Sequence, residues 1–183
     1  MAKKGRDFLS QRLLQGAGKK NVLSSHVQNF TIVSYSRKYQ KDIVELNATA
    51  LDKSKKFNEK WNPKWNADLE KIEEIYLKNG GAFLVLLVDE KLIGTGALLK
   101  VDEKTVKAKR LRIHPAYQQK GLSMLLMSEL EKKARELNYR KLVADIVKCN
   151  VPAEKVLLKT SFAKSHETYF DGVLCVLFEK ELG

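Results

Sequence analysis

The chain contains 183 residues, of which 44% are hydrophobic and 31% charged, a composition that indicates one globular domain and excludes a disordered chain. Its longest apolar run, residues 82–88, is far shorter than the about 20 residues that a membrane-spanning helix needs. The apolar runs near the start are too short for a secretory signal peptide, and the cysteines and histidines lack the spacing of zinc ligands. We therefore expect a cytoplasmic protein with no membrane partner and no metal site.

The net charge of +12 is concentrated at the front of the chain. Residues 1–65 carry 14 Lys and Arg against 5 Asp and Glu, whereas residues 66–183 carry 20 against 17. Such an excess attracts polyanions, although solubility explains a lysine-rich surface equally well. Residues 1–27 are basic and too short to fold alone, so we expect a mobile arm there and an independent domain over residues 28–183.

The first part of this domain predicts one strand and two helices. Residues 30–35 have the composition of a strand, and residues 39–51 carry apolar side chains at helical spacing. A polar, lysine-rich connection follows over residues 52–65. Asn66 is expected to cap the second helix, which Asn79-Gly80-Gly81 ends.

The rest of the chain alternates strands with two further helices. The expected strands cover residues 82–88, 92–99, 106–113, 142–147, 169–170 and 172–179, and the expected helices cover residues 120–137 and 153–159. The first three of these strands form an antiparallel meander, and the longer helix connects two parallel strands. The sequence therefore predicts an α/β (α+β) fold, with a mixed, mostly antiparallel sheet of about seven strands and helices on both faces.

The segment between the strand at 106–113 and the following helix carries the most informative pattern. It reads Ile113-His114-Pro115-Ala116-Tyr117-Gln118-Gln119-Lys120-Gly121-Leu122-Ser123. A helix N-terminus offers free amides and a positive dipole to a phosphate, and Gly121 lets the backbone approach it closely. Alone, Gln-x-x-Gly-x-Ser is more typical of an ordinary strand-to-helix turn. Its position in a βαβ unit and a second matching segment downstream favour an anion site.

With that downstream segment, the sequence resembles the GNAT-type N-acetyltransferases. Their signature, Gln/Arg-x-x-Gly-x-Gly/Ala after an apolar-x-Pro turn, is matched by Gln118–Ser123 with a serine in the last position. Asn150, Ala153 and the run Lys159–Phe162 match a further family pattern, in which Ser161 replaces a glycine. The resemblance implies that acetyl-CoA lies between two splayed parallel strands and acetylates a primary amine of a small molecule or protein.

The resemblance also implies which residues bind acetyl-CoA. The backbone of Leu111 and Ile113 would pair with pantetheine like an added strand, and amides from Gln119 to Met124 would hold the pyrophosphate. Asn150 would contact the cofactor from the second strand. The implied cofactor-binding residues are Leu111, Arg112, Ile113, Gln118, Gln119, Lys120, Gly121, Leu122, Ser123, Met124 and Asn150.

Acetyl transfer also needs a base, because an amine with a pKa of about 10.4 must lose a proton before it attacks. The resemblance implies Asp145 as the general base, since some members carry a catalytic glutamate there; a structural acid is the alternative. Lys107 occupies another usual base position and cannot serve.

The general acid is harder to identify. Many members place a tyrosine where this chain has Leu157, and nothing in the spacing selects Tyr169 or Tyr139 as its substitute. Cys149 is expected to be a small buried residue and not a nucleophile, because no histidine is spaced to activate it.

The resemblance implies an acceptor site in the lysine-rich connection, with a solvated loop as the alternative. Its candidate residues are Lys53, Lys55, Lys56, Phe57, Lys60, Trp61, Lys64 and Trp65. Cations interleaved with aromatic rings suit an acidic or nucleic-acid-like partner. The second hypothesis is therefore a basic nucleic-acid- or ribosome-associated protein built on a catalytically weak acetyltransferase-like domain. Under either hypothesis we expect a monomer or a homodimer.

Overall fold

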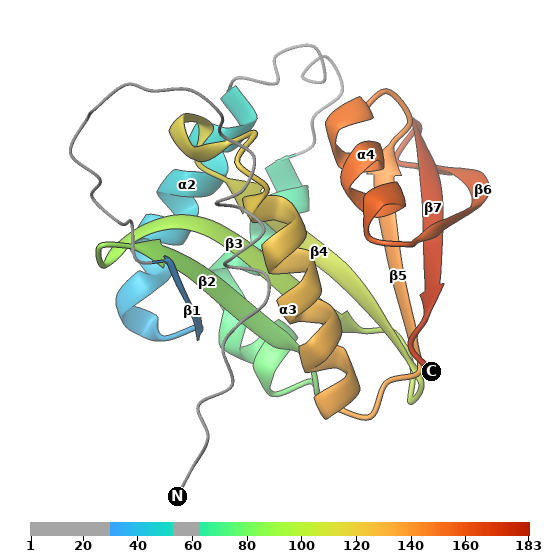
Figure 1. Ribbon diagram of the computed structural model, residues 1–183, viewed down its shortest axis with the longest axis horizontal. Coiled ribbons are helices and arrows are strands. Elements are labelled where there is room, and N and C mark those ends of the chain that lie inside the picture. The colour runs from blue at the N-terminus through green and yellow to red at the C-terminus, as the bar shows by residue number, and fades with distance from the viewer. Residues whose placement is uncertain (1–29, 53–62) are drawn as a thin grey trace, which may run out of the picture.

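The computed structural model describes residues 30–52 and 63–183, which contain a seven-stranded mixed sheet (Figure 1). Its strands are β1 (Phe30–Ser34), β2 (Ala82–Val88), β3 (Lys91–Lys100), β4 (Thr105–Ile113), β5 (Lys141–Val147), β6 (Ala163–Phe170) and β7 (Val173–Glu181). They lie in the order β1-β2-β3-β4-β5-β7-β6, and every neighbouring pair is antiparallel except β4 with β5. The predicted fold class is confirmed.

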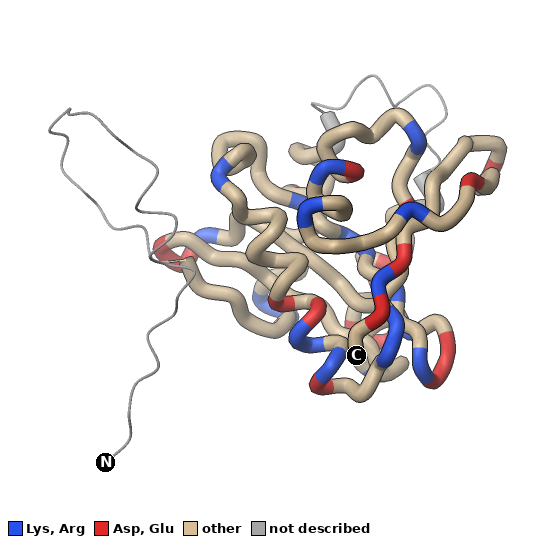
Figure 2. The backbone as a smooth tube through the Cα atoms, turned by 45° about the vertical axis from the view of Figure 1, so that its right-hand side comes forward, with Lys and Arg blue, Asp and Glu red and all other residues tan. Residues whose placement is uncertain are grey.

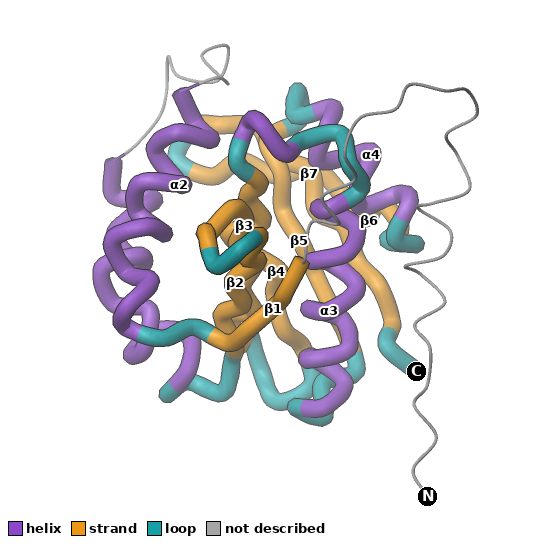
Figure 3. The backbone as a smooth tube through the Cα atoms, turned by 60° about the vertical axis from the view of Figure 1, so that its left-hand side comes forward, coloured by secondary structure: helices purple, strands orange, loops and turns teal. Residues whose placement is uncertain are grey.

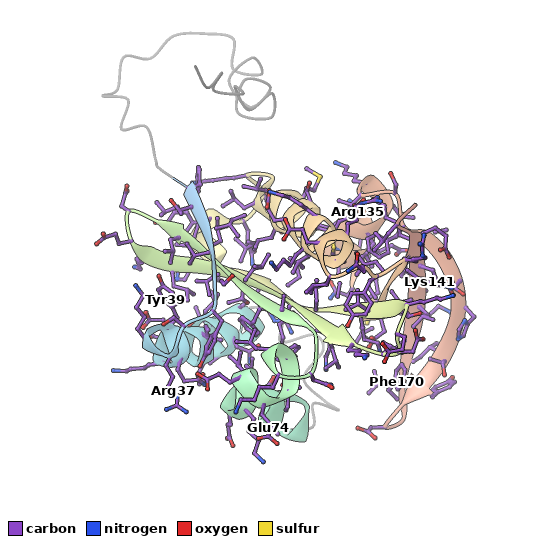
Figure 4. The ribbon with its side chains drawn as sticks, turned by 90° about the horizontal axis from the view of Figure 1, so that it is seen from below. Arg37, Tyr39, Glu74, Arg135, Lys141 and Phe170 are labelled. Carbon is purple, nitrogen blue, oxygen red and sulfur yellow. The ribbon has the colours of Figure 1, made fainter. Side chains whose placement is uncertain are left out.

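Helices cover both faces of the sheet, as Figure 3 shows. They are α2 (Gln40–Asp52), α3 (Leu122–Glu136) and α4 (Val151–Lys159), with 3-10 segments η1 (Arg37–Tyr39), η3 (Pro63–Lys71) and η5 (Pro115–Tyr117) and a π-helical turn η4 (Glu73–Leu77). In Figure 4, Tyr39 and Glu74 lie on one side of the sheet and Arg135 of α3 lies on the other. Among the described residues, no helix combines the length and apolar character needed to span a bilayer.

Two apolar cores form because β2 is buried on both faces. Leu84 and Leu86 belong to the core beneath α3 and α4, whereas Phe83 and Val85 belong to the core beneath α2, η3 and η4. A strand covered on both faces reads as a continuous apolar run, and this is why residues 82–88 show no alternation. Each large side chain buried in this way contributes about 1.5–3 kcal/mol to folding.

The structure differs from the prediction at the helix after Asn66. The chain forms η3 from Pro63 and then the π-helical turn η4 in place of one capped helix. Asn66 Oδ1 accepts a hydrogen bond from Arg110 Nη1 at 2.8 Å, so the predicted cap is wrong. A charged donor forms a stronger hydrogen bond than a neutral amide, and Pro63 has the fixed φ that suits a first helical position.

Strand β6 is also longer than predicted. It begins at Ala163, well before the expected start at residue 169, and pairs along β7 at the edge of the sheet. Almost all of its residues are exposed, so no alternation of apolar and polar side chains marks it in the sequence.

Candidate active site

Strands β4 and β5 pair only where both begin. Thr105–Lys107 lie opposite Lys141–Val143, and beyond these positions the two strands diverge (Figure 1). β4 then pairs only with β3, and β5 only with β7. Within the described chain, the facing edges of the split therefore have no ladder partner. An extended ligand can pair with such an edge through main-chain hydrogen bonds.

A β-bulge at Arg110 shapes the β4 side of the split. The register shifts between Thr95 and Ala97, and Arg110 has a φ of 56°. Thr95 Oγ1 donates to the carbonyl oxygen of Arg110 at 2.8 Å and holds the bulge. Such a bulge bends its strand, consistent with β4 turning away from β5. After it, Arg112 lies opposite Thr95 and shares its face of the sheet.

The turn after β4 presents the N-terminus of α3. Gln118 Nε2 donates to the carbonyl oxygen of Ile113 at 3.1 Å, and Gly121 has a φ of 79°, a conformation that favours glycine. The amides of Met124 and Leu125 donate to the carbonyl oxygen of Gly121. The amides of residues 119–123 form no backbone hydrogen bond with any described residue, as expected of a first helical turn that can bind an anion.

The predicted cofactor residues lie on both sides of the split. Leu111–Ile113 and residues 118–124 follow one another along β4, the turn and α3. The side chain of Leu122 is buried in the core, whereas Met124 is exposed. Asn150 lies across the split, after β5, where its Oδ1 accepts from the amide of Ala153 at 3.3 Å and caps α4.

The candidate base is paired with the residue that occupies the other base position. Lys107 Nζ lies 2.8 Å from Asp145 Oδ1, and both side chains are half-buried. Lys107 Nζ also lies 5.6 Å from the centre of the Phe170 ring, which stands on the same side of the sheet as Glu74 in Figure 4. The pair thus bridges β4 and β5 close to where the split opens.

A buried network around Asp68 was not predicted from the sequence. Its carboxylate accepts hydrogen bonds from Arg110 Nε at 2.9 Å, from Arg110 Nη2 and from the Tyr76 hydroxyl. Burial disfavours the charged form, but the hydrogen bonds from Arg110 and Tyr76 outweigh it and lower the pKa of Asp68. Burial and Asp68 raise the pKa of Tyr76. The network joins η3 and η4 to the β4 bulge. Asp68 and Arg110 are 42 residues apart, too far for any local motif to reveal their contact.

Arg112 is half-buried beside this network. Its Nη1 donates to the carbonyl oxygen of Leu111 at 3.1 Å, while its Nε is buried and has no hydrogen-bond partner among the described residues. Burial lowers the pKa of Arg112 to about 10, and the positive charge of Arg110 acts in the same direction. The guanidinium is thus a charged group with an unused donor.

The general-acid candidates lie in different surroundings. Leu157 is buried and has no proton to give. Tyr139 is buried, and its hydroxyl donates to the carbonyl oxygen of Gly80 at 2.9 Å. Tyr169 is 69% exposed and lines an open depression of about 420 Å³ with the end of β5 and the β6–β7 turn. Cys149 lines the same depression and is exposed, so its predicted burial is wrong, because it lies in the turn after β5 and not within the strand.

Several predicted regions lie outside the described residues. They include the basic arm at residues 1–27 and the candidate acceptor residues Lys53, Lys55, Lys56, Phe57, Lys60 and Trp61. Lys64 and Trp65 belong to η3, but their side chains are not described. Within the part of the chain that is described, no three His, Cys, Asp or Glu side chains are grouped as a metal site requires.

Comparisons with known proteins agree with this arrangement. The chain resembles an acetyltransferase structure from Streptococcus agalactiae, with 20% identity, a TM-score of 0.74, and coverage of 83% of this chain and 98% of that one. A candidate acetyltransferase from Salmonella typhimurium, solved with its cofactor acetyl-CoA, has 20% identity and a TM-score of 0.68 over 84% of this chain and 94% of that one. At these identities the likeness establishes the fold.

Sequence comparisons point the same way. The chain is 27% identical over 109 residues to human N-acetyltransferase 8B, a match covering 56% of this chain and about half of the relative, 48% of its length. The model of the acetyltransferase (GNAT) family matches residues 46–162, which include the second half of α2, the split between β4 and β5, and the N-terminus of α3. This chain therefore belongs to the GNAT family of acetyltransferases.

Proposed function

We propose that this protein is an N-acetyltransferase that transfers an acetyl group from acetyl-CoA to a primary amine of a small molecule or protein, by direct attack in a ternary complex. The observation that carries the proposal is the divergence of β4 from β5 beside the N-terminus of α3. It combines an open strand edge with a group of free amides. The Salmonella relative solved with acetyl-CoA supports the same assignment.

The residues around the split fit acetyl-CoA. The backbone of Leu111 and Ile113 pairs with the pantetheine arm, while amides from residue 119 onward hold the pyrophosphate. Because the amide of Met124 already donates to Gly121, the free donors are those of residues 119–123. No acidic residue lies in the first turn of α3 to repel the phosphates. When bound, acetyl-CoA supplies the acetyl thioester, and Asn150 adds a contact from the β5 side.

Asp145 acts as the general base in this proposal. It accepts the proton of the acceptor ammonium, directly or through water, so that the amine nitrogen can bond to the thioester carbon as the carbon–sulfur bond breaks. As the amide forms, the nitrogen releases its second proton to solvent. Lys107, at 2.8 Å, fixes the position of the carboxylate. Since Leu157 has no proton to give, the proton for the departing sulfur comes from solvent or from the exposed Tyr169.

Calorimetric titration of the full chain with acetyl-CoA tests the cofactor site. Saturable binding is expected for the wild type, and Gly121→Trp should abolish it by filling the space next to the phosphate donors. Gly172→Trp is the matched control, because Gly172 also has a positive φ, 76°, but its added Cβ would meet nothing within 4 Å. Absence of binding by the folded wild type, or equal loss in both variants, contradicts the proposal.

The base is tested separately through the rate of transfer. Asp145→Asn keeps the shape of the side chain but removes its ability to take a proton, so kcat should fall by roughly 10²–10⁴-fold. The dissociation constant for acetyl-CoA should change little, because none of the proposed cofactor contacts uses this carboxylate. An unchanged kcat would leave Asp145 as a structural partner of Lys107.

A further inference from the structure

We infer that the acceptor is an amine with a carboxylate close to it, as in an α-amino acid, and that Arg112 and Asn47 recognise these two groups. This inference rests on the proposed acetyltransferase function and names the substrate class of its acceptor site. It is drawn from two buried polar atoms that have no hydrogen-bond partner among the described residues, and from the charges around them.

The first observation is an excess of positive charge on the α2-facing side of β4. Lys109 and Arg112 lie opposite Ala97 and Thr95 and therefore share the face that α2, η3 and η4 cover. The Asp68 carboxylate accepts two hydrogen bonds from Arg110, and its Oδ2 lies 3.8 Å from Lys109 Nζ. Arg112 forms no ion pair with any residue that the structure describes. Elsewhere opposite charges lie close together, as the blue and red segments near the C-terminus show in Figure 2. Lys141, for example, forms an ion pair with Glu179.

The second observation is a pair of buried, unsatisfied groups of complementary kind. Arg112 Nε is a donor without an acceptor, and Asn47 Oδ1 is an acceptor without a donor among the described residues. Asn47 is only 6% exposed and lies on α2, next to Leu46, in the layer where this helix packs on β3 and β4. Buried polar groups are nearly always hydrogen-bonded, because each one left unsatisfied costs folding free energy. Two such groups in one layer therefore indicate that a ligand supplies the missing partners.

The chemistry of the two groups selects the ligand. A guanidinium matches the planar geometry of a carboxylate, and an amide oxygen accepts from an amine or ammonium. A molecule that satisfies both carries an amine and a carboxylate side by side. Because Arg112 is only half-buried, its side chain can reorient toward such a ligand by a rotamer change.

The position of Arg112 places this ligand at the reaction. Arg112 lies between Leu111 and Ile113, the two residues whose backbone would pair with the pantetheine arm. A group held by its side chain would therefore lie beside that arm. Recognition of the carboxylate would in this way bring the neighbouring amine to the thioester, which lowers the barrier by orientation.

The test compares free amino acids with their carboxamides, which keep the amine and the side chain but remove the negative charge. The full chain, with acetyl-CoA, should show a kcat/KM roughly 10–100-fold higher for the free acids, the range expected of one charged hydrogen bond. Arg112→Met should remove this preference by raising KM for the acids, while Arg112→Lys should restore part of it. Arg135→Met is the matched control on the opposite side of the sheet and should leave the preference intact (Figure 4).

The outcomes separate this inference from the proposed function. If acetyl-CoA does not bind, the proposed function fails. If it binds and the carboxamides or simple amines react as fast as the free acids, or no free acid reacts, the function stands and the inference is overturned. Faster transfer to phosphoethanolamine than to any amino acid would also overturn it, in favour of a phosphate. A merely structural Arg112 would lower the melting temperature on replacement without changing the preference for acids.

Discussion

Replacing Asp68 by alanine should destabilise the fold more than removal of any surface charge. Asp68 is the carboxylate partner of Arg110, and the two side chains are only 13% and 6% exposed. Removing it leaves the Arg110 guanidinium buried without this carboxylate and the Tyr76 hydroxyl without its acceptor. Breaking a buried ion pair on one side costs about 3–5 kcal/mol, because the remaining charge stays desolvated.

The expected loss is large enough to measure in two ways. For a chain of this size, each kcal/mol lowers the melting temperature by about 2–4 °C, so Asp68→Ala should melt roughly 6–20 °C below the wild type. Urea unfolding followed by circular dichroism should report the same free energy through a lower midpoint with an unchanged slope. Adding Tyr76→Phe to Asp68→Ala should cost less than Tyr76→Phe costs alone, because the hydroxyl has then already lost its acceptor.

The pH dependence gives an independent check. The pKa of Asp68 in the fold lies below its ordinary value of 3.8, so its ionised form is favoured by folding. A carboxyl group of this kind stabilises the protein above its unfolded pKa, and the stabilisation is lost as the pH falls through the folded pKa. The gap in unfolding free energy between wild type and Asp68→Ala should therefore be constant from pH 5 to 7 and shrink in stronger acid.

Glu103→Ala is the control for these measurements. Glu103 pairs with Lys100 at 2.5 Å, but its side chain is 88% exposed, so its removal should leave the melting temperature nearly unchanged. If Asp68→Ala were as mild as this control, or if its effect were the same at pH 3 and pH 7, Asp68 would not be the buried anchor of η3 and η4.

Three further outcomes are expected. Gly96→Val should lower the unfolding free energy by about 1–3 kcal/mol in urea denaturation, because its Cβ would lie 2.9 Å from Leu130 Cδ1. An unchanged free energy would mean that α3 can shift away from β3 without cost. Asn150→Ala should cost about 1 kcal/mol by removing the cap of α4 and should also weaken acetyl-CoA binding in calorimetry, whereas a purely structural cap would leave that affinity unchanged. Removing residues 1–27 should leave the affinity for acetyl-CoA unchanged, since every proposed contact lies between residues 111 and 150. A clear loss of affinity would show that these residues contribute to cofactor binding.

Local patterns in the sequence were sufficient to predict most of the fold. The apolar run at 82–88 became β2 with the predicted bounds, and α3 lies within the predicted range 120–137 because its apolar residues recur at helical spacing. The start of α3 was also predicted, since the helix was expected to begin next to Gly121 and begins at Leu122. Each of these features depends on residues close together in the chain.

Features that depend on distant residues could not be predicted. Asn66 has the chemistry of a helix cap, and only its contact with Arg110 makes it a partner of β4 instead. The Asp68 network likewise arises from packing of η3 and η4 on the sheet, and the lack of a partner for Arg112 Nε among the described residues shows only in the folded chain. The first six residues of strand β6 escaped prediction for another reason, because its pairing with β7 leaves both polar and apolar side chains exposed.

The ion pair between Lys107 and Asp145 connects the two kinds of information. From the sequence, Lys107 was a lysine at a position where other family members carry the base, and Asp145 was a separate candidate on another strand. The structure places Lys107 Nζ 2.8 Å from Asp145 Oδ1, across the point where β4 and β5 separate. The carboxylate is therefore still present at this point of the split, contributed by β5 and held by the lysine of β4. A lysine here does not by itself argue against catalysis, because it positions the very group that the proposed mechanism needs.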